Sequence, residues 1–358
     1  MALEVVMVII SDEMIKPSSP TPIHLRNLKL SVLDQISPPI YVPLIFFYNH
    51  HQLELKKLQI SSGVDEKVML KVKICFFECG GISVAISLSH KIADGTSLVA
   101  FVNAWAAATR GETLEFKPSF DFASVFPPRD LSVLESTQTV GCTQEKIVTK
   151  RFGFDKEELT KFKMINSSGS QVKNIPTRVE AVSSYIWRRF IDAAKAKEKG
   201  STKTTSFAAA HAVNLRPRKS PPFLQHMFGN CWRPAIALSG PEASEAELVG
   251  KLRGAITRMD GDFIGQIENE LCLNVLSRSV ELFIKGGLEK CLFSSWCRFP
   301  VYEVDFGWGK PVWVCTTTLP FKNLVILMST PCGEGIEAWV NILEEDMKMF
   351  EQGQELNI

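Results

Sequence analysis

Hydrophobic and polar positions alternate most regularly from Leu70 to Phe76, where lysines separate the apolar residues. This two-residue period is typical of a half-buried strand. Gly80-Gly81 then offers a tight turn, and an apolar run follows from Ile82 to Leu88. The pattern predicts a β-hairpin.

Helical spacing of apolar residues predicts a helix from Thr96 to Thr109, which ends near Gly111. In the second half, Asp155 with Glu158 and Thr177 with Glu180 have the spacing of capping boxes and predict two helix starts. The second of these helices carries Val179, Val182, Ile186 and Phe190 on one face. Further strands are expected at Val5–Ile10, Ile40–Phe47, Phe207–Val213, Pro311–Thr317 and Leu324–Met328, and further helices at Ala243–Met259 and Phe263–Ile284.

The stretch 112–150 has little periodicity and many Pro and Ser residues, which is typical of a long connection. A chain of 358 residues also exceeds the usual size of a single hydrophobic core. We therefore predict a mixed α/β protein with an N-terminal domain at 1–117, a crossover connection at 118–150 and a C-terminal domain at 151–358.

Composition narrows the class of protein. The 40 Lys and Arg residues nearly balance the 39 Asp and Glu residues, so neither a nucleic acid nor a membrane surface is an expected partner. The apolar run Val5–Ile10 is too short for a signal peptide and is followed by acidic residues. The nine cysteines include no Cys-x-x-Cys pair, which favours reduced thiols. These features predict a cytoplasmic protein.

Candidate chemistry lies at His90, in the sequence Ser89-His90-Lys91-Ile92-Ala93-Asp94-Gly95. The segment joins the end of a predicted strand to the start of a predicted helix, a junction that can place a catalytic side chain accurately. Histidine moves protons near neutral pH. Asp94 stands where the helix N-terminus favours negative charge, and Gly95 tolerates unusual backbone angles.

Taken alone, this string is also compatible with a loop histidine followed by a helix cap, because short motifs often match by chance. A metal site is less favoured. His50-His51 is the only other histidine cluster, and no His/Cys set has convincing zinc spacing. No serine lies in a nucleophile-elbow context.

A second string, Asp305-Phe306-Gly307-Trp308-Gly309, lies in the other half of the chain. With both strings present and in this order, the sequence resembles the plant BAHD acyltransferase family, whose signatures are His-x-x-x-Asp-Gly and Asp-Phe-Gly-Trp-Gly. Several further segments resemble the vinorine synthase-like, alkaloid-acetylating branch: 76–81, 212–218, 229–230, 294–298 and 337–339.

The resemblance implies two domains similar to chloramphenicol acetyltransferase, with a tunnel between them. It implies that His90 is the general base and that Asp94 pairs with Arg216. It also implies that Ser294 and Trp296 lie near the reacting carbonyl, where an oxyanion needs a hydrogen-bond donor. Asp305 enters as a catalytic candidate because the family motif is often credited with a second proton acceptor. The aromatic and glycine neighbours of Asp305 favour a structural role instead. Structural support of the site is also expected from Gly95, Gly307, Trp308 and Gly309.

The resemblance further implies acyl-CoA, and in this branch acetyl-CoA, as co-substrate, with neither a metal nor a permanently bound cofactor. The expected acceptor is a hydroxyl of a plant specialised metabolite such as an alkaloid, and the expected form is a monomer. An amine acceptor stays open, because the same base could deprotonate it.

The chain departs from the family between Phe47 and Met69, where members carry a long helix, a strand and a further hairpin. Here only a short polar bridge connects the two predicted strands. Three explanations stay open: neighbouring strands close up, the first domain is weakened, or the sequence reflects an internal deletion. A non-catalytic relative that only binds ligands is therefore the competing class.

Overall fold

The computed structural model describes residues 20–23, 26–49, 68–113, 117–132, 145–167, 175–197, 206–218, 223–269, 272–284 and 288–351. The expected strand at Val5–Ile10 and the pair His50-His51 lie outside these residues. Among the described residues, no helix has the length and apolar character needed to cross a membrane.

The strands are β1 Tyr41–Tyr48, β2 Leu70–Phe76, β3 Ile82–Ser89, β4 Ile147–Phe154, β5 Ser206–Asn214, β6 Trp232–Ser239, β7 Leu288–Ser295, β8 Trp313–Cys315, β9 Leu324–Ser329 and β10 Ile336–Leu343. The helices are α1 Val32–Gln35, α2 Gly95–Thr109, α3 Phe122–Val125, α4 Lys156–Ser167, α5 Arg178–Lys197, α6 Glu245–Thr257, α7 Gly261–Glu268, α8 Cys272–Ile284 and α9 Glu344–Glu351.

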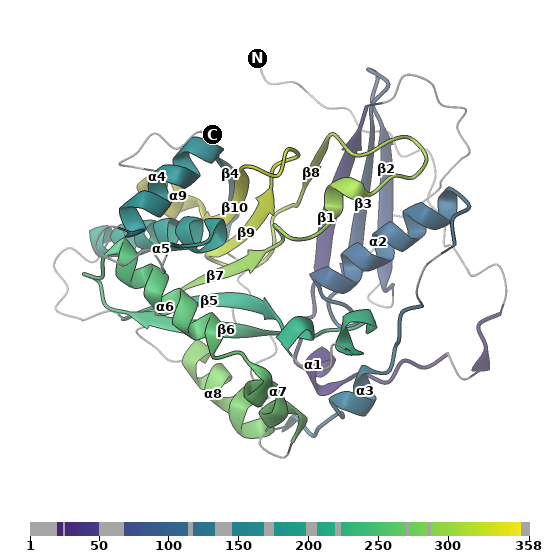
Figure 1. Ribbon diagram of the computed structural model, residues 1–358, viewed down its shortest axis with the longest axis horizontal. Helices are drawn as coiled ribbons and strands as arrows, with labels where there is room; N and C mark the ends of the chain where they lie inside the picture. The colour runs from purple at the N-terminus through teal and green to yellow at the C-terminus, as the bar shows by residue number, and fades with distance from the viewer. Residues whose placement is uncertain are drawn as a thin grey trace.

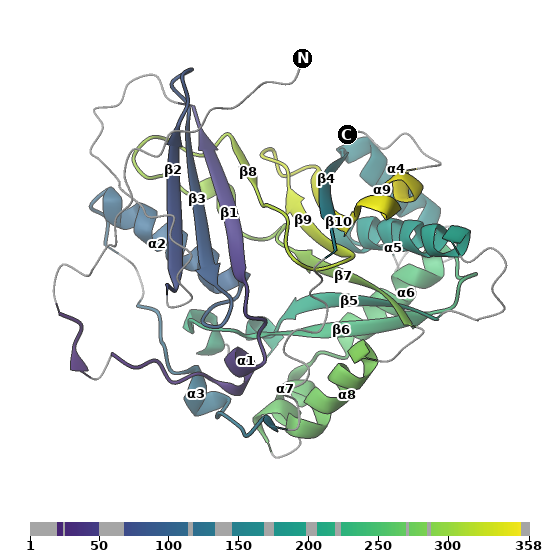
Figure 2. The same ribbon diagram turned by 180° about the vertical axis from the view of Figure 1, so that it is seen from behind.

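The first sheet has the strand order β2-β3-β1-β8. β3 pairs antiparallel with β2 on one side and with β1, over its full length, on the other. The predicted hairpin is thereby confirmed, and no gap separates these strands. α2 covers one face of this sheet, as the two opposite views in Figures 1 and 2 show. Its buried residues Leu98 and Val102 pack in one cluster with Leu44 and Ile86 of the sheet.

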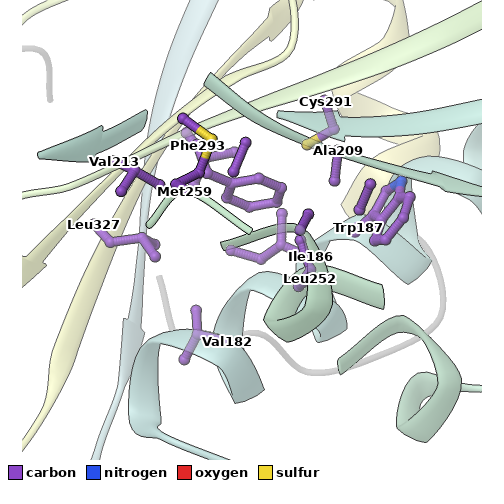
Figure 3. Close-up of a cluster of buried hydrophobic side chains, with 14 of the residues drawn as sticks. Val182, Ile186, Trp187, Ala209, Val213, Leu252, Met259, Cys291, Phe293 and Leu327 are labelled. Atoms are coloured by element: carbon purple, nitrogen blue, oxygen red, sulfur yellow. The ribbon is translucent and has the colours of Figure 1, made fainter. Parts of the chain in front are cut away.

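The second sheet has the order β4-β10-β9-β7-β5-β6. α5 and α6 pack against one of its faces and build the larger core of the molecule. Figure 3 shows this core, in which Ile186 and Trp187 of α5 and Leu252 of α6 meet Ala209 of β5 and Phe293 of β7.

β9 connects the two cores. Its residues from Leu324 to Met328 are all buried, with Val325 and Leu327 in the larger core and Leu324 and Ile326 in the core of the first sheet. A continuous apolar run is what a strand covered on both faces requires. The second sheet therefore lies between its own helices and the first sheet, and the mixed α/β fold class is confirmed.

Two features differ from a simple division along the chain. β8 comes from the second half but pairs with β1 of the first sheet. β4 begins at Ile147, inside the stretch expected to be a connection. The domain boundaries at 117 and 150 therefore stay a prediction.

Most predicted elements are confirmed, including both capping boxes, in which Asp155 and Thr177 exchange hydrogen bonds with Glu158 and Glu180. The single helix predicted over Phe263–Ile284 is wrong. The structure has α7 and α8 there, because Asn269 takes an extended conformation that ends α7. Asparagine side chains compete with helical backbone hydrogen bonds, which makes such an end favourable. Strands β4, β6, β7 and β10 were not predicted.

Candidate active site

A cavity of about 330 Å³ lies between the two sheets. His90, Asp94 and Thr96 line it from the first half of the chain, and Trp232 and Ser294 from the second. Apolar side chains dominate the rest of the wall, among them Val42, Leu292, Phe299 and Ile326. This volume and lining suit a small-molecule site.

His90 follows directly on β3, and its position is fixed at both backbone and side chain. Its backbone N–H donates to the carbonyl of Ile40 at 2.8 Å, which ties the turn to the residue before β1. Its Nδ1 lies 3.0 Å from Oδ1 of Asn230, and its ring lies 5.7 Å from the ring of Trp232, centroid to centroid. The imidazole is thus held at the cavity wall.

Burial lowers the pKa of His90 below the usual 6.5, because a buried site disfavours the charged imidazolium. The backbone carbonyl of His90, the side chain of Asn230 and the carboxylates of Asp94 and Asp34 oppose this effect in part. At neutral pH the ring is therefore uncharged and able to accept a proton, as a general base must be.

Asp94 caps α2, and both of its carboxylate oxygens accept hydrogen bonds from buried donors. Its Oδ1 accepts from the backbone N–H of Ser97 at 2.9 Å, and its Oδ2 accepts from Nη1 of Arg216 at 2.7 Å and from the N–H of Cys231 at 2.9 Å. The side chains of Asp94 and Arg216 are only 7% and 3% exposed. Burial alone would raise the pKa of Asp94, but Arg216 and these N–H donors lower it. The predicted ion pair is confirmed, and it joins the two halves of the chain.

Gly95 is the first residue of α2, and close packing explains it. A Cβ at this position would lie 2.8 Å from a ring carbon of Phe299. Gly95 does not use the unusual backbone angles that a glycine tolerates, because it is not among the positive-φ residues. The missing side chain lets Phe299 approach the helix start beside the cavity.

Ser294 is the penultimate residue of β7 and lines the cavity, and Trp296 is the first residue after this strand. The indole N–H of Trp296 donates to Oγ of Ser294 at 3.0 Å. Because Oγ accepts this bond, the hydroxyl hydrogen of Ser294 is available to another acceptor. Trp296 has used its single polar hydrogen, so of the two candidates Ser294 is the better donor to an oxyanion.

Asp305 does not line the cavity. Its Oδ1 accepts from the backbone N–H groups of Gly307 at 2.7 Å and Gly309 at 2.9 Å, and its carbonyl accepts from Nη1 of Arg110. Gly307 and Gly309 have φ values of 99° and 92°, which this tight turn requires. Phe306 and Trp308 pack edge-on against Tyr48 of β1.

The structure therefore brings His90, Ser294 and Trp296 together at one cavity, supports His90 through Asp94 and Arg216, and places Asp305 in a separate packed turn. Sequence reasoning gave no role to Asn230, Asp34 or Trp232. Gly229-Asn230 attracted notice only as part of a resemblance. Within the described residues, no group of three or more His, Cys, Asp or Glu side chains could hold a metal ion.

The profile of the Transferase family matches residues 5–62 and 51–357. The chain belongs to the Transferase family. It is 35% identical to stemmadenine O-acetyltransferase of Catharanthus roseus over 96% of both chains. It is 32% identical to vinorine synthase in the crystal structure of that protein, with a TM-score of 0.77 over 95% of both chains.

A more distant structure, TRI101 of F. sporotrichioides complexed with coenzyme A and T-2, has a TM-score of 0.68 at 15% identity over 92% of this chain and 98% of that one. It shares the fold. The resemblance to the BAHD acyltransferases and to their alkaloid-acetylating branch is confirmed, and the protein is an acyltransferase.

The comparisons also locate the shortened region. The alignment with stemmadenine O-acetyltransferase spans 419 positions, although this chain has 358 residues, so the relative carries residues that have no counterpart here. The family profile matches in two pieces that meet at 51–62, between Phe47 and Met69.

Proposed function

We propose that this protein transfers an acetyl group from acetyl-CoA to a hydroxyl of a plant specialised metabolite such as an alkaloid. The observation that carries the proposal is the uncharged His90 at the wall of a largely apolar cavity that also holds Ser294. An O-acetyltransferase at 35% identity supports the choice of group and acceptor, and coenzyme A bound to a protein of this fold supports the donor.

The reaction follows from these groups. Nε2 of His90 takes the proton of the acceptor hydroxyl, and the resulting oxygen nucleophile attacks the thioester carbonyl. The hydroxyl of Ser294 donates a hydrogen bond to the oxyanion of the tetrahedral intermediate, and Trp296 holds this serine in place. When the C–S bond breaks, His90 returns its proton to the sulfur of coenzyme A. The acyl group passes directly between substrates, so no nucleophilic residue, metal or bound cofactor takes part.

The remaining site residues act through geometry. Asp94 and Arg216 fix the start of α2 beside His90, and Gly95 lets Phe299 close the wall. Asp305, Gly307, Trp308 and Gly309 stabilise a turn that packs on β1. In this proposal Asp305 carries no proton.

The test is incubation of the purified protein with acetyl-CoA and a panel of alkaloid and terpenoid alcohols, with release of the coenzyme A thiol as the readout. His90→Ala should lower the rate by about 10² to 10⁴. His226→Ala is the matched control. His226 is an exposed residue at the end of a 3₁₀ turn and does not line the cavity, so this variant should retain activity.

A His90→Ala variant with more than about a tenth of the parent rate would exclude His90 as the base. Binding of acetyl-CoA without turnover of any acceptor would favour the non-catalytic alternative. Acylation of amines but not alcohols would favour an N-acyltransferase.

A further inference from the structure

The contacts of Asn230 determine which nitrogen of His90 carries a proton. Nδ2 of Asn230 donates to the carbonyl of His90 at 2.8 Å and to Oδ1 of Asp34 at 2.9 Å. Both partners are acceptors, so this end of the side chain is the NH₂ group. The other end, Oδ1, faces Nδ1 of His90 at 3.0 Å and cannot donate. Nδ1 must therefore carry the hydrogen, and Nε2 keeps the lone pair that a base needs.

Asp34 holds Asn230 in this orientation. Oδ1 of Asp34 accepts from both the backbone N–H and the side chain of Asn230, each at 2.9 Å. Its Oδ2 accepts from the backbone N–H of Ser31 at 2.9 Å and from Oγ of Ser31 at 2.6 Å, in the capping box of α1. Asp34 is 3% exposed, and Asn230 and Ser31 are fully buried. Four donors thus fix a buried carboxylate, and the carboxylate fixes the amide.

The backbone at Gly229 places Asn230 in this position. Gly229 has a φ of 146°, and a Cβ there would lie 2.5 Å from a ring carbon of Phe122. Its carbonyl accepts from Nη2 of Arg216 at 2.9 Å. The residue before Asn230 is therefore held by the guanidinium that also pairs with Asp94.

We propose that Asn230, held by Asp34, is a positioning residue that keeps His90 in the Nδ1–H tautomer and so makes Nε2 the base. The arrangement suits both halves of the reaction. When Nε2 gains the substrate proton, Nδ1 still donates to Asn230, so no partner must move during turnover. The proposal rests on the proposed function, because it assigns a role within that reaction.

Nitrogen-15 NMR of histidine-labelled protein tests the tautomer without substrate. The chain has six histidines, so the signals of His90 must first be assigned. They are the signals that disappear in the variant His90→Gln. We expect its Nδ1 to be protonated in the parent protein and the Nε2–H form to gain population in Asn230→Ala. Asn103→Ala is the matched control. Asn103 is a partly buried asparagine of α2 that donates to the carbonyl of Val99 at 3.0 Å and does not line the cavity. It should leave the signals unchanged.

Kinetics supply the second readout. Asn230→Ala should lower kcat about 10- to 100-fold, the cost that is typical of losing the partner that orients a metal-bound histidine, while KM for acetyl-CoA changes little. The double variant Asp34→Asn with Asn230→Asp keeps a hydrogen bond between the two side chains but sets the carboxylate directly on Nδ1. It should move the acid limb of kcat/KM to higher pH by about one unit, because an adjacent negative charge favours imidazolium.

In the NMR experiment, an Nε2–H tautomer of His90 in the parent protein would overturn the inference, and so would the same tautomer in Asn230→Ala as in the parent. In the kinetic experiment, a double variant whose acid limb of kcat/KM does not move would overturn it as well. The proposed function and the role of Asn230 are tested by different measurements. A parent protein that acylates no acceptor would count against the proposed function, while the NMR result would still decide the tautomer. An active enzyme with the Nε2–H form would refute the positioning role alone.

Discussion

His90 combines two properties that a general base requires at neutral pH. Its environment keeps the imidazole uncharged, and its place at the end of β3 keeps the ring at the cavity wall. Since its pKa lies below 6.5, kcat/KM should be level near pH 7 and decline as the pH falls below 6.5, where solvent protons occupy Nε2. A pH–rate profile with acetyl-CoA measures this. An acid limb centred above pH 7 would contradict the assignment of the base.

Asp94 and Arg216 allow a prediction about stability. Arg216→Met strands a carboxylate whose side chain is 7% exposed, and removing one partner of a buried pair costs about 3–5 kcal/mol. Adding Asp94→Asn should recover part of that loss, because no buried charge is then left unpaired. Urea unfolding of the parent, the two single variants and the double variant measures the coupling. Additive losses would show that the two charges do not depend on each other.

At the scale of elements, the turn of Asp305 works through backbone hydrogen bonds. Asp305→Asn keeps an oxygen that can accept from the N–H groups of Gly307 and Gly309. We therefore expect a folded enzyme that retains most of its activity. Asp305→Ala should lower stability by about 0.5–1.5 kcal/mol for each of the two hydrogen bonds that it removes from this exposed turn. Thermal unfolding and turnover of both variants are the measurements. A well-folded Asp305→Asn protein as inactive as His90→Ala would identify Asp305 as a proton carrier.

How far the sequence predicts each element depends on how local its signal is. The β2–β3 hairpin and the capping boxes of α4 and α5 rest on residues a few positions apart, and the structure has them. β6 was not predicted, and it contains Pro234, a residue that is unfavourable in the interior of a central strand. Among the described strands, β6 stands at the end of the order of the second sheet, and an edge strand is where a proline is tolerated.

For the site too, only features with a local sequence signal could be predicted from the residues themselves. His90 and Asp94 were predicted because they share one short motif, and the Asp94–Arg216 pair because a family resemblance supplied it. The contacts of Asn230 with His90 and Asp34 join positions 140 and 196 residues apart along the chain. Neither periodicity nor spacing within one sequence reveals such contacts, because they exist only after the two sheets have packed together.

The whole molecule depends on contacts that cross between its halves. β8 from the second half extends the first sheet, and β9 contributes side chains to both cores. The shortened region between Phe47 and Met69 affects the same sheet. β1, β3 and β2 pair without interruption, so of the three explanations the structure favours closure of neighbouring strands. Closure leaves β2 at the end of the strand order, with Met69, Phe76 and Phe77 51%, 48% and 42% exposed beside it.

This geometry supports a last prediction: insertion of a segment from a relative between Asn49 and Lys67 should raise both stability and turnover. A restored strand adds ladder hydrogen bonds worth about 0.5–1.5 kcal/mol each, together with the apolar area it covers. The sum is comparable with the roughly 5–15 kcal/mol that stabilises a typical domain. The first sheet of the present chain should therefore unfold at a lower temperature than the second, and the insertion should bring the two transitions together.

A glycine- and serine-rich insertion of equal length is the control, since it adds chain without strand-forming or apolar residues. A single sharp transition in the present chain, with brisk turnover of acetyl-CoA, would show that closure of β1 on β3 already compensates for the missing residues.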